Sequence, residues 1–463
     1  MKIVQPKMES SGFDPKADST PIIKPKLVFT PFMRFLGVNE LPLRSQWLIQ
    51  KFLFILNLQS SLFIISSTFY VLFVIDRIGF STLGMLLAIS FLTQALLDYP
   101  TGVIGDWIGQ RWSLAIAFCG YGLSYSVIIH ATSLTDFLFV YLLSAFANSQ
   151  QSGALGSWFD NNYKVSVGKT DSDRKTYREL FGKQAFLSRF LTAAMIILGG
   201  VTATIFFREL LFIVQAFGLF GLAFLCLLLV KDYPEITKPE LSFRRYFSLL
   251  GEGLRFSFGS KHMLFFVVGL SITSTTLLIW GNMILFPMYF GYTGSDGVAA
   301  FIRFSFYVLI GFTMPRAGKW SKNLNARKWI PRLRLIHTVL FYGSFTLIFT
   351  LFPFENRLNL LAIVIAGFTF LVTECLLATD GFLRQRLLVD VVPDTNRNSV
   401  YSLLPTLSLL VSAPFIFISG NIIELVGVPS TLIGLMLLGF ISSGFFFLSL
   451  RSLPKGVLKE EEG

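Results

Sequence analysis

Four ionisable residues lie inside long apolar segments of this 463-residue chain: Asp98, Arg189, Arg303 and Glu374. An ionised side chain inside a membrane is costly, so such residues mark functional sites by default. Desolvation favours the neutral form of a carboxyl group, whereas a neighbouring arginine favours the charged form. We therefore predict that Asp98 or Glu374, with Arg189 at a similar depth, takes up and releases a proton. A static ion-pair cluster of these three residues is the alternative.

Uncharged polar side chains at helical spacing in several apolar segments predict a cavity for a polar or amphipathic solute. Interhelical hydrogen bonding is the alternative for each side chain taken singly. Arg303, in the outer part of its segment, could bind an anionic group of the solute, extend to the surface, or pair with an acid in a loop. The candidates for the cavity are Asn57, Ser61, Gln94, Asn148, Gln151, Ser271, Thr275, Trp280, Asn282 and Arg303.

The composition indicates a protein that is surrounded by lipid. Of its residues 53% are hydrophobic and only 14% are charged, whereas soluble domains have about 25% charged residues. The apolar residues come in long blocks, and the net charge of +12 is not carried by a basic segment within a soluble fold. This pattern disfavours nucleic acid as a partner and favours a lipid bilayer.

The sequence contains no pattern typical of an enzyme or of a metal site. It has no P-loop, no HExxH, no GxSxG and no cluster of cysteine and histidine residues. The three cysteines lie in separate apolar runs, and we expect them to be small buried residues. We therefore expect no catalytic residues, no cofactor and no metal.

The apolar blocks predict an all-α polytopic membrane protein. A membrane-spanning helix needs about 20 mostly apolar residues. Twelve such blocks occur, and a polar loop at 231–262 divides them into six and six. The expected spans are residues 50–75, 80–104, 112–131, 135–158, 184–206, 209–230, 263–290, 298–318, 333–353, 358–382, 398–424 and 428–450.

The basic residues predict the orientation of these spans. With the N-terminus in the cytoplasm, 34 of the 39 lysines and arginines fall in tails and loops on the cytoplasmic side. Arg77, Arg208 and Arg357 fall on the other side, and Arg189 and Arg303 lie within spans. Because basic residues are enriched on the cytoplasmic side of membrane proteins, we predict that both termini are cytoplasmic.

A weak internal repeat supports a division into two halves of six spans each. A shift of 216 residues places Gly102, Gly109 and Arg111 on Gly318, Asn325 and Arg327, and a shift of 220 places Asp160 on Asp380. The resulting parts are a cytoplasmic tail expected to be disordered (1–47), an N-terminal half (48–230), a central cytoplasmic loop (231–262), a C-terminal half (263–451) and a cytoplasmic C-terminal tail (452–463).

The stretch DYPTGVIGDWIGQRW, residues 98–112, lies where the second predicted span ends. Its glycines allow helices to approach closely, and Asp106 at a membrane boundary requires a partner. Arg111, Asp160 and the positive N-terminus of the eleventh span are expected on the same face. We predict a latch that holds the two halves together on the inside, with a permanent salt bridge as the alternative. The latch residues are Gly102, Asp106, Gly109, Arg111, Asp160, Arg327 and Asp380.

The same stretch resembles the signature loop of the major facilitator superfamily. Its first five residues, Asp-Tyr-Pro-Thr-Gly, resemble the acid-x-Pro-Thr-Gly form of a branch rich in prokaryotic drug and small-solute exporters. The stretches SGALGSWFD (152–160) and PDTNRNSVYSL (393–403) resemble the fourth and eleventh spans of that branch. The chain departs from the pattern at Trp107 and Gln110, where basic residues are usual, and its fifth span lacks the Gly-Pro pair of many antiporters.

The resemblance implies the major facilitator fold, in which two six-helix halves rock about a cavity lined by spans one, four, seven and ten. We predict a monomeric secondary transporter in the plasma or inner membrane that exports a small organic solute in exchange for protons. Uptake symport and uniport are alternatives within the same fold. A membrane scaffold or sensor that has this fold and moves no solute is the alternative from a different class.

Overall fold

The computed structural model describes residues 30–168, 170–171, 173–236 and 243–454, and within these ranges all regular secondary structure is helical. The N-terminal helices are α1 (Thr30–Leu36), α2 (Leu43–Ile64), α3 (Tyr70–Ile108), α4 (Gln110–Ile128), α5 (Leu134–Gln151), α6 (Ala154–Val167), α7 (Lys175–Ile205) and α8 (Arg208–Leu229). The C-terminal helices are α9 (Phe243–Gly259), α10 (Lys261–Ile279), α11 (Leu285–Gly291), α12 (Asp296–Lys322), α13 (Ala326–Thr338), α14 (Ser344–Leu351), α15 (Leu360–Val391), α16 (Asp394–Val426) and α17 (Val428–Ser452). The π-helical turns η1 (Trp280–Ile284) and η2 (Val339–Gly343) join α10 to α11 and α13 to α14.

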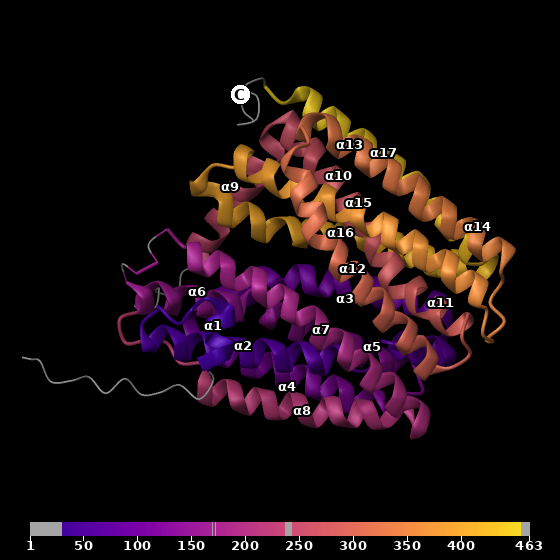
Figure 1. Cartoon of the computed structure of the whole chain (residues 1–463), viewed down its shortest axis with the longest axis horizontal. Helices are drawn as coiled ribbons and strands as arrows, with labels where there is room; N and C mark the ends of the chain where they lie inside the picture. The colour runs from indigo at the N-terminus through magenta and orange to yellow at the C-terminus, as the bar shows by residue number, and fades with distance from the viewer. Residues whose placement is uncertain (1–29, 169, 172, 237–242, 455–463) are drawn as a thin grey trace, which may run out of the picture.

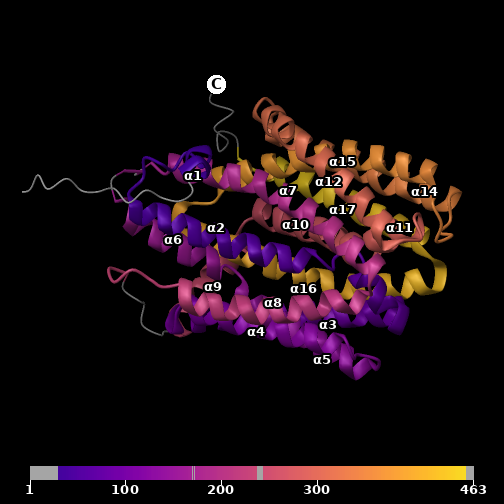
Figure 2. The same cartoon turned by 60° about the horizontal axis from the view of Figure 1, so that its bottom comes forward.

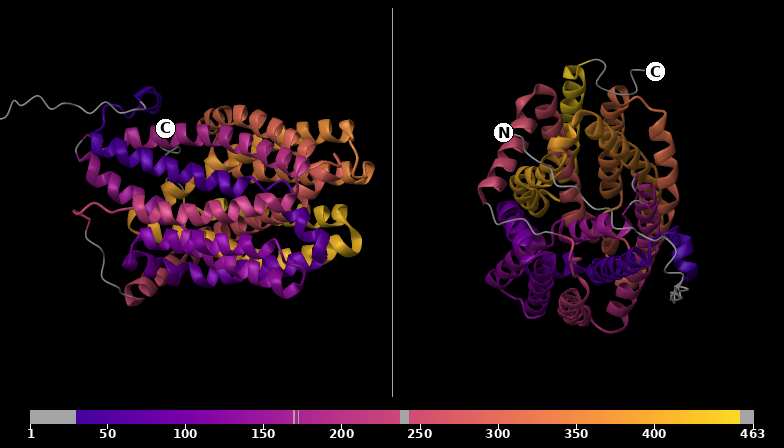
Figure 3. Two further views of the ribbon diagram at one scale, coloured as in Figure 1. Left: turned by 90° about the horizontal axis from the view of Figure 1, so that it is seen from below. Right: turned by 90° about the vertical axis from the view of Figure 1, so that its left-hand side faces the viewer.

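The long helices run side by side in one bundle (Figures 1 and 3). Helices α2 to α8 form one half, and helices α10 to α17 form the other (Figure 1). Two pairs of helices join the halves, since α16 packs along α3 and α12 packs along α7. Figure 2 shows α16 near α3. We call these contacts the α3/α16 seam and the α7/α12 seam.

Ten of the described helices, counting helices joined by a π turn as one, are long and apolar enough to cross a membrane. Their outer surfaces carry large apolar side chains such as Phe217 and Phe368, which are 74% and 69% exposed, as expected for contact with lipid. Helices α4 and α5, with 19 and 18 residues, are not among the ten, although α4 packs against α8 and α5 against α3. The two spans predicted there stay predictions.

The first predicted span, 50–75, is interrupted in the structure. Helix α2 ends at Ile64 and helix resumes at Tyr70. The Ser67 hydroxyl donates to the Ile64 carbonyl oxygen at 2.6 Å, and such local bonds compete with helical ones. Between the first and second predicted spans, Gly79 interrupts α3 with φ 73° and ψ 174°, a conformation that glycine adopts without steric cost. Gly79 therefore breaks the helix between these two predicted spans, whereas the break inside the first predicted span was missed.

The fourth predicted span, 135–158, is also divided. Helix α5 ends at Gln151 and α6 begins at Ala154. Gly153 between them has φ 72°, in the left-handed region, and a residue in that conformation commonly ends a helix. The glycine of the SGALG stretch therefore serves a turn between two helices.

The N-terminal tail, expected to be disordered through residue 47, is partly helical. Residues 30–47 contain α1 and the start of α2. Met33 and Leu36 are buried in an apolar cluster that includes residues of α2 and Leu180 of α7. The prediction of disorder is therefore wrong for residues 30–47, because apolar side chains there have a surface to cover. Residues 1–29 lie outside the described part of the chain.

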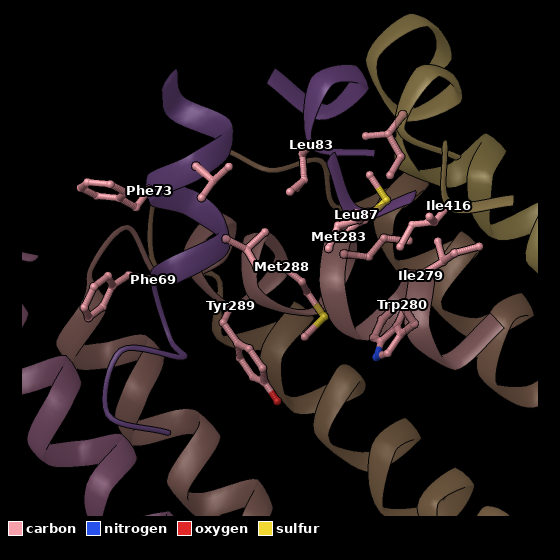
Figure 4. Packing of buried hydrophobic residues seen from close by; sticks show 14 of the residues in the cluster. Phe69, Phe73, Leu83, Leu87, Ile279, Trp280, Met283, Met288, Tyr289 and Ile416 are labelled. Atoms are coloured by element: carbon pink, nitrogen blue, oxygen red, sulfur yellow. The ribbon is translucent and has the colours of Figure 1, made fainter. Parts of the chain in front are cut away.

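The bundle has two ends, which we name after an acidic residue at each. The Asp296 end contains the start of α12, the start of α8 and the turn between α16 and α17. The Asp160 end contains α6 and α9. A buried apolar cluster joins the halves towards the Asp296 end, where Leu83 of α3 lies near Met283 of η1 and Ile416 of α16 (Figure 4).

Candidate functional site

Polar contacts close the α7/α12 seam at the Asp296 end. The guanidinium of Arg208, at the start of α8, donates to both carboxylate oxygens of Asp296 on α12, at 2.8 and 3.0 Å. The backbone N–H of Gly297 donates to the hydroxyl of Thr204 on α7 at 2.8 Å. Both contacts join residues of the N-terminal half to residues of the C-terminal half, so the halves are tied together at this end.

Glycines bring the backbones of both seams into contact at the same end. A Cβ atom on Gly200 of α7 would lie 2.1 Å from the Cβ of Ala300 on α12. A Cβ atom on Gly84 of α3 would lie 2.9 Å from the carbonyl oxygen of Ile416 on α16. Small residues permit such close helix packing in membranes. Neither seam could close as it does with a larger residue at these positions.

Polar side chains of α16 bind the start of the second predicted span. The Ser81 backbone N–H donates to Glu424 Oε2 at 2.6 Å, and the Ser81 hydroxyl donates to Asn421 Oδ1 at 2.7 Å. A Cβ atom on Gly79 would lie 3.1 Å from the same oxygen, Glu424 Oε2. The α3/α16 seam is thus held by both backbone packing and hydrogen bonds near the Asp296 end.

Arg303 lies in the closed part of the interface between the halves. Its side chain is fully buried, and it donates to the hydroxyls of Ser67 at 3.2 Å and Thr68 at 2.6 Å, in the N-terminal half. Its guanidinium carbon lies 4.7 Å from the centre of the Phe286 ring. Among the described side chains, no carboxylate pairs with it, and its Nε has no hydrogen-bond partner. Arg303 is therefore a buried cation that does not reach the surface, and no loop acid in the described part of the chain pairs with it.

Asp98, a predicted proton-coupling residue, lies in the α3/α16 seam. Its Oδ2 accepts a hydrogen bond from the hydroxyl of Thr406 on α16 at 3.4 Å. Its Oδ1 is buried and has no hydrogen-bond partner among the described residues. Asp98 thus connects the two halves through one of its carboxylate oxygens.

The other two predicted proton-coupling residues, Arg189 and Glu374, lie near each other across the α7/α12 seam. Arg189 of α7 is exposed and lines a pocket that also contains residues of α12 and α15. Glu374 of α15 is partly buried, and Arg189 acts on it electrostatically. The described ion pairs do not include Asp98 with Arg189, so the structure brings together two of the three residues and places Asp98 in the other seam.

Several predicted cavity residues contact each other or a neighbouring helix. The Asn148 amide on α5 donates to Gln94 Oε1 on α3 at 2.8 Å. The Gln184 amide on α7 donates to Asn57 Oδ1 on α2 at 3.0 Å, and the Ser61 hydroxyl donates to the backbone oxygen of Asn57. Gln94 and Asn148 form an exposed polar pair, whereas Asn57 joins two helices of one half.

The cavity candidates on α10 and η1 are less accessible. Ser271 and Thr275 are buried, and the Thr275 hydroxyl lies 2.8 Å from that of Ser412 on α16. Trp280 is 5% exposed and packs against the rings of Phe341 and Phe345, each with its centre 4.7 Å away. The cavity candidates that are at least partly accessible are Asn57, Ser61, Gln94, Asn148, Gln151 and Asn282.

The predicted latch is distributed over both halves. Asp160 pairs with Lys164 at 2.7 Å and with Arg174, both close to it in sequence, and not with Arg111. Although partial burial disfavours its charged form, these two cations hold the pKa of the Asp160 carboxyl below its ordinary value. The side chain of Asp106 lies outside the described residues, as do those of 394–399 at the start of α16.

The remaining latch residues occupy turns and the C-terminal half. Gly109 forms the turn between α3 and α4 with φ 93°, and Gly102 precedes it in α3. Arg327 donates to the backbone oxygens of Leu453 and Pro454 at 3.1 and 3.0 Å. Asp380 was expected at the end of its span, but α15 continues to Val391. Asp380 is therefore buried rather than terminal.

A buried charged cluster surrounds Asp380 and was missed in the sequence. Asp380 lies 3.1 Å from Arg384, and Arg334 of α13 acts on it electrostatically. Arg334 is fully buried and donates to Thr276 of α10 at 3.0 Å. His337, one turn from Arg334, is also buried. Arg334 was counted among the cytoplasmic basic residues because the predicted span at 333–353 starts only one residue before it.

The three basic residues that break the orientation pattern each have an acidic partner. For Arg77 and Arg208 the acidic partner is distant in the sequence, so the sequence alone did not identify it. The pairs are Arg77 with Glu209 at 3.4 Å, Arg208 with Asp296 at 2.8 Å, and Arg357 with Glu355.

No protein-family profile and no curated protein sequence matches the chain. Solved structures do match its helices. The nucleoside transporter NupG superposes with a TM-score of 0.61 at 14% identity, over 89% of this chain and 98% of that one. A D-xylose–proton symporter superposes with a TM-score of 0.59 at 14% identity, over the same shares of the two chains.

A third similar structure is a bacterial homologue of the human lysosomal transporter Spinster, in an inward-facing and unoccupied conformation. Its TM-score is 0.65 at 13% identity, over 89% of this chain and 98% of that one. Identities this low establish shared architecture and nothing about the solute. In its arrangement of helices, the chain shares the fold of these three transporter structures.

Proposed function

We propose that the chain is a secondary active transporter that moves a small organic solute across a membrane by alternating access. The observation that carries this proposal is the interface between the halves, which is tied at the Asp296 end and contains Asp98, Arg189 and Glu374 farther along. Proteins of this architecture bind the solute between two halves that rock around a fixed site. The structural neighbours are a nucleoside transporter, a homologue of a lysosomal transporter and a sugar symporter, which supports this class.

In the proposed topology, α4 and α5 complete twelve spans and both termini are cytoplasmic. The Asp296 end then faces outward, from a plasma or inner membrane, and the Asp160 end faces the cytoplasm. The pairing of Arg77, Arg208 and Arg357 with acids supports this orientation, because each outward-facing basic residue is neutralised. The halves are residues 48–230 and 263–451, and the described conformation corresponds to an inward-facing stage, as in the Spinster homologue.

Proton coupling is proposed to involve Asp98 and Glu374. An ionised carboxylate and a neutral carboxyl group at an interface have different binding partners, so proton uptake changes the relative stability of the two conformations. Asp98 has one oxygen without a hydrogen-bond partner among the described residues, and Glu374 has Arg189 as its neighbouring cation. These two acids could therefore transmit protonation to the α3/α16 and α7/α12 seams respectively.

The favoured direction is export, with the solute contacted in the interior by residues such as Gln94 and Asn148. When the outward end opens, Asp106, Arg111 and Asp160 are proposed to form the latch with the start of α16. The latch is not required in the inward-facing stage. The direction of transport is a separate proposal from the proposal that the chain is a secondary active transporter. Uptake is the alternative, and the similarity to a D-xylose–proton symporter supports it.

Counterflow tests the proposed class. Purified protein in liposomes is loaded with an unlabelled solute, and uptake of the same labelled solute is followed across a panel of sugars, nucleosides, zwitterions and amphipathic drugs. Transient accumulation of one labelled solute above its external concentration is the expected result. An imposed pH gradient of either sign then distinguishes antiport from symport by the direction of net movement. Lack of movement of every solute in the panel, with folded protein, would favour the scaffold or sensor.

A further inference from the structure

A pocket of about 260 Å³ opens between the two halves, on the side of the α7/α12 seam that faces the Asp160 end. Its wall is formed by α7, α12 and α15, and half of its lining residues are aromatic. Part of this wall is accessible, since Phe186 is 51% and Phe312 is 59% exposed. The principal side chains of the pocket are Phe186, Arg189 and Phe190 of α7, Tyr307 and Phe312 of α12, and Phe382 of α15.

The pocket lies at the depth of the inner leaflet in the proposed orientation. The outer end of α7 is Ile205, and the outer end of α12 is Asp296. Arg189 and Phe312 are separated from these ends by the same number of residues. At 1.5 Å per residue both lie about 24 Å from those ends. The hydrocarbon core is about 30 Å thick. Both residues therefore lie in its inner half.

The two helices of this seam diverge from the Asp296 end towards the Asp160 end (Figure 1). They touch at Gly200 and Ala300, and the bond from Gly297 to Thr204 closes them farther out. The pocket therefore begins where the helices separate. A molecule in the pocket could arrive from the inner leaflet or the cytoplasm but would be blocked on the outer side.

Charge restricts what this pocket can hold. Arg189 is the one ionisable cation among the lining residues, and these include no carboxylate. A guanidinium at membrane depth is costly unless it has a partner, and it forms strong paired hydrogen bonds with carboxylate and phosphate groups. Arg189 acts electrostatically on Glu374 of α15, and the Arg189 side chain itself remains exposed. The guanidinium can thus receive an anionic group while aromatic rings cover an apolar one.

We propose that this pocket binds a single-chain amphipathic anion, such as a long-chain carboxylate, that enters from the inner leaflet between α7 and α12. Arg189 binds the acidic head, and the phenylalanines contact the start of the apolar chain. The proposal rests on the proposed transporter function and specifies its solute class. A fully polar solute would leave the aromatic wall without a partner, and a cationic one would be repelled by Arg189.

Photo-crosslinking tests binding without requiring transport. The protein is placed in phosphatidylcholine nanodiscs with a diazirine-bearing palmitate, and crosslinked peptides are identified by mass spectrometry. The matching alcohol and amine probes, which have the same chain, are the controls for the head group. The expected result is saturable crosslinking to α7 and α12 by the palmitate probe, suppressed by excess unlabelled palmitate, with at least fivefold less crosslinking by the other two probes.

Three variants test the site itself. Arg189→Gln should reduce specific crosslinking at least fivefold, whereas Arg189→Lys should retain most of it because the charge remains. Gly311→Leu should reduce crosslinking through a different cause, since a side chain on this lining glycine meets nothing within 4 Å and would occupy the pocket. The matched control is Arg77→Gln at the opposite end of the bundle, which should leave crosslinking unchanged.

The outcomes separate this proposal from the proposed function. Equal crosslinking by the palmitate and alcohol probes, or full crosslinking in both Arg189→Gln and Gly311→Leu, would overturn the pocket even if counterflow reveals a transported solute. Crosslinking that depends on Arg189 and Gly311 would support the pocket even if no solute in the counterflow panel moves. A folded Gly311→Leu protein keeps the test decisive if Arg189→Gln does not fold.

Discussion

The two seams between the halves are built from different contacts. In the α3/α16 seam, Gly84 packs against the backbone of α16, and the contact continues inward to the hydrogen bond between Asp98 and Thr406. In the α7/α12 seam, the closure at Asp296 is followed by a pocket beside Arg189. One seam thus stays in contact from its end to the middle of the bundle, whereas the other separates.

This difference has consequences for how the molecule can move. Between helices in lipid, association depends on packing and hydrogen bonds, because lipid supplies no hydrophobic driving force. A backbone contact such as that of Gly84 is lost only if a whole helix shifts. An ion pair such as Arg208 with Asp296 can break and be replaced by water at one end. We therefore expect the α3/α16 seam to act as the joint and the α7/α12 seam as the opening.

The largest expected effect distinguishes which seam responds to protons. Asp98→Asn or Glu374→Gln should abolish accumulation of solute against its gradient and leave exchange measurable. Each substitution replaces a carboxyl group that is proposed to alternate between its charged and neutral forms with a side chain that is always neutral. Solute can then still bind and exchange, but proton movement no longer drives its accumulation. Uphill transport and exchange are measured in proteoliposomes with and without an imposed pH gradient.

Asp173→Asn, which changes an exposed loop acid, is the matched control and should keep full coupling. Loss of coupling in Asp98→Asn alone would assign the proton to the α3/α16 seam, and loss in Glu374→Gln alone would assign it to the α7/α12 seam. If both variants still concentrate the solute, neither residue carries the proton.

The second prediction concerns the joint. Gly84→Val should destabilise the closed α3/α16 seam by about 3 kcal/mol, because overpacking typically costs about 1–3 kcal/mol and the first added atom would meet the Ile416 carbonyl. Thermal unfolding in detergent should occur several degrees lower. The control Gly434→Val adds the same atoms where nothing lies within 4 Å of the Cβ. Equal melting of the two variants would show that the seam does not depend on backbone contact.

The positions of the long helices were predictable from the sequence, because lipid requires about 20 apolar residues in a row. The structure places α8 at Arg208–Leu229, where residues 209–230 were predicted. The breaks were less predictable. Ser67 and Gly153 are residue types that also occur within membrane helices, and only the surrounding packing determines that they interrupt a helix here.

The depth of the candidate site stays a prediction, and the direction of its side chains could not be predicted. Arg189, Glu374 and Asp98 were placed at one level of the membrane by counting residues from the helix ends. Depth leaves open which way a side chain points around its helix, and Asp98 faces α16 rather than the other two residues. Pairs such as Arg208 with Asp296 join distant parts of the chain, so no local pattern in a single sequence identifies them.

The third prediction concerns the closure of the α7/α12 seam. Asp296→Asn should shift the population towards the outward-open conformation by roughly thirtyfold, corresponding to about 2 kcal/mol. This is below the usual cost of about 3–5 kcal/mol for breaking a buried pair, because Arg208 remains 21% exposed. The readout is the distance between spin labels at Thr132 and Leu358, in the two halves, in a background without the native cysteines. Arg357→Gln, which breaks a surface pair, is the control, and an unchanged distance distribution in Asp296→Asn would contradict a role for the pair in closure.

The smallest expected effect concerns the Asp160 end, where the ion pairs of the described residues join Asp160 to Lys164 and Arg174 of its own half. Lys164 and Arg174 lower the pKa of its carboxyl below the ordinary 3.8, so its ionised form stabilises the folded protein at neutral pH. That stabilisation is lost as the pH falls through the lowered pKa. Because Lys164 is largely exposed, solvent screening limits the effect to about 0.5–1 kcal/mol. Asp160→Asn should therefore melt slightly lower than the parent protein at pH 7, and the difference should shrink below about pH 4. A difference that grows in acid would mean that Asp160 is stabilised as the neutral acid, and its proposed role as a charged latch residue would fail with it.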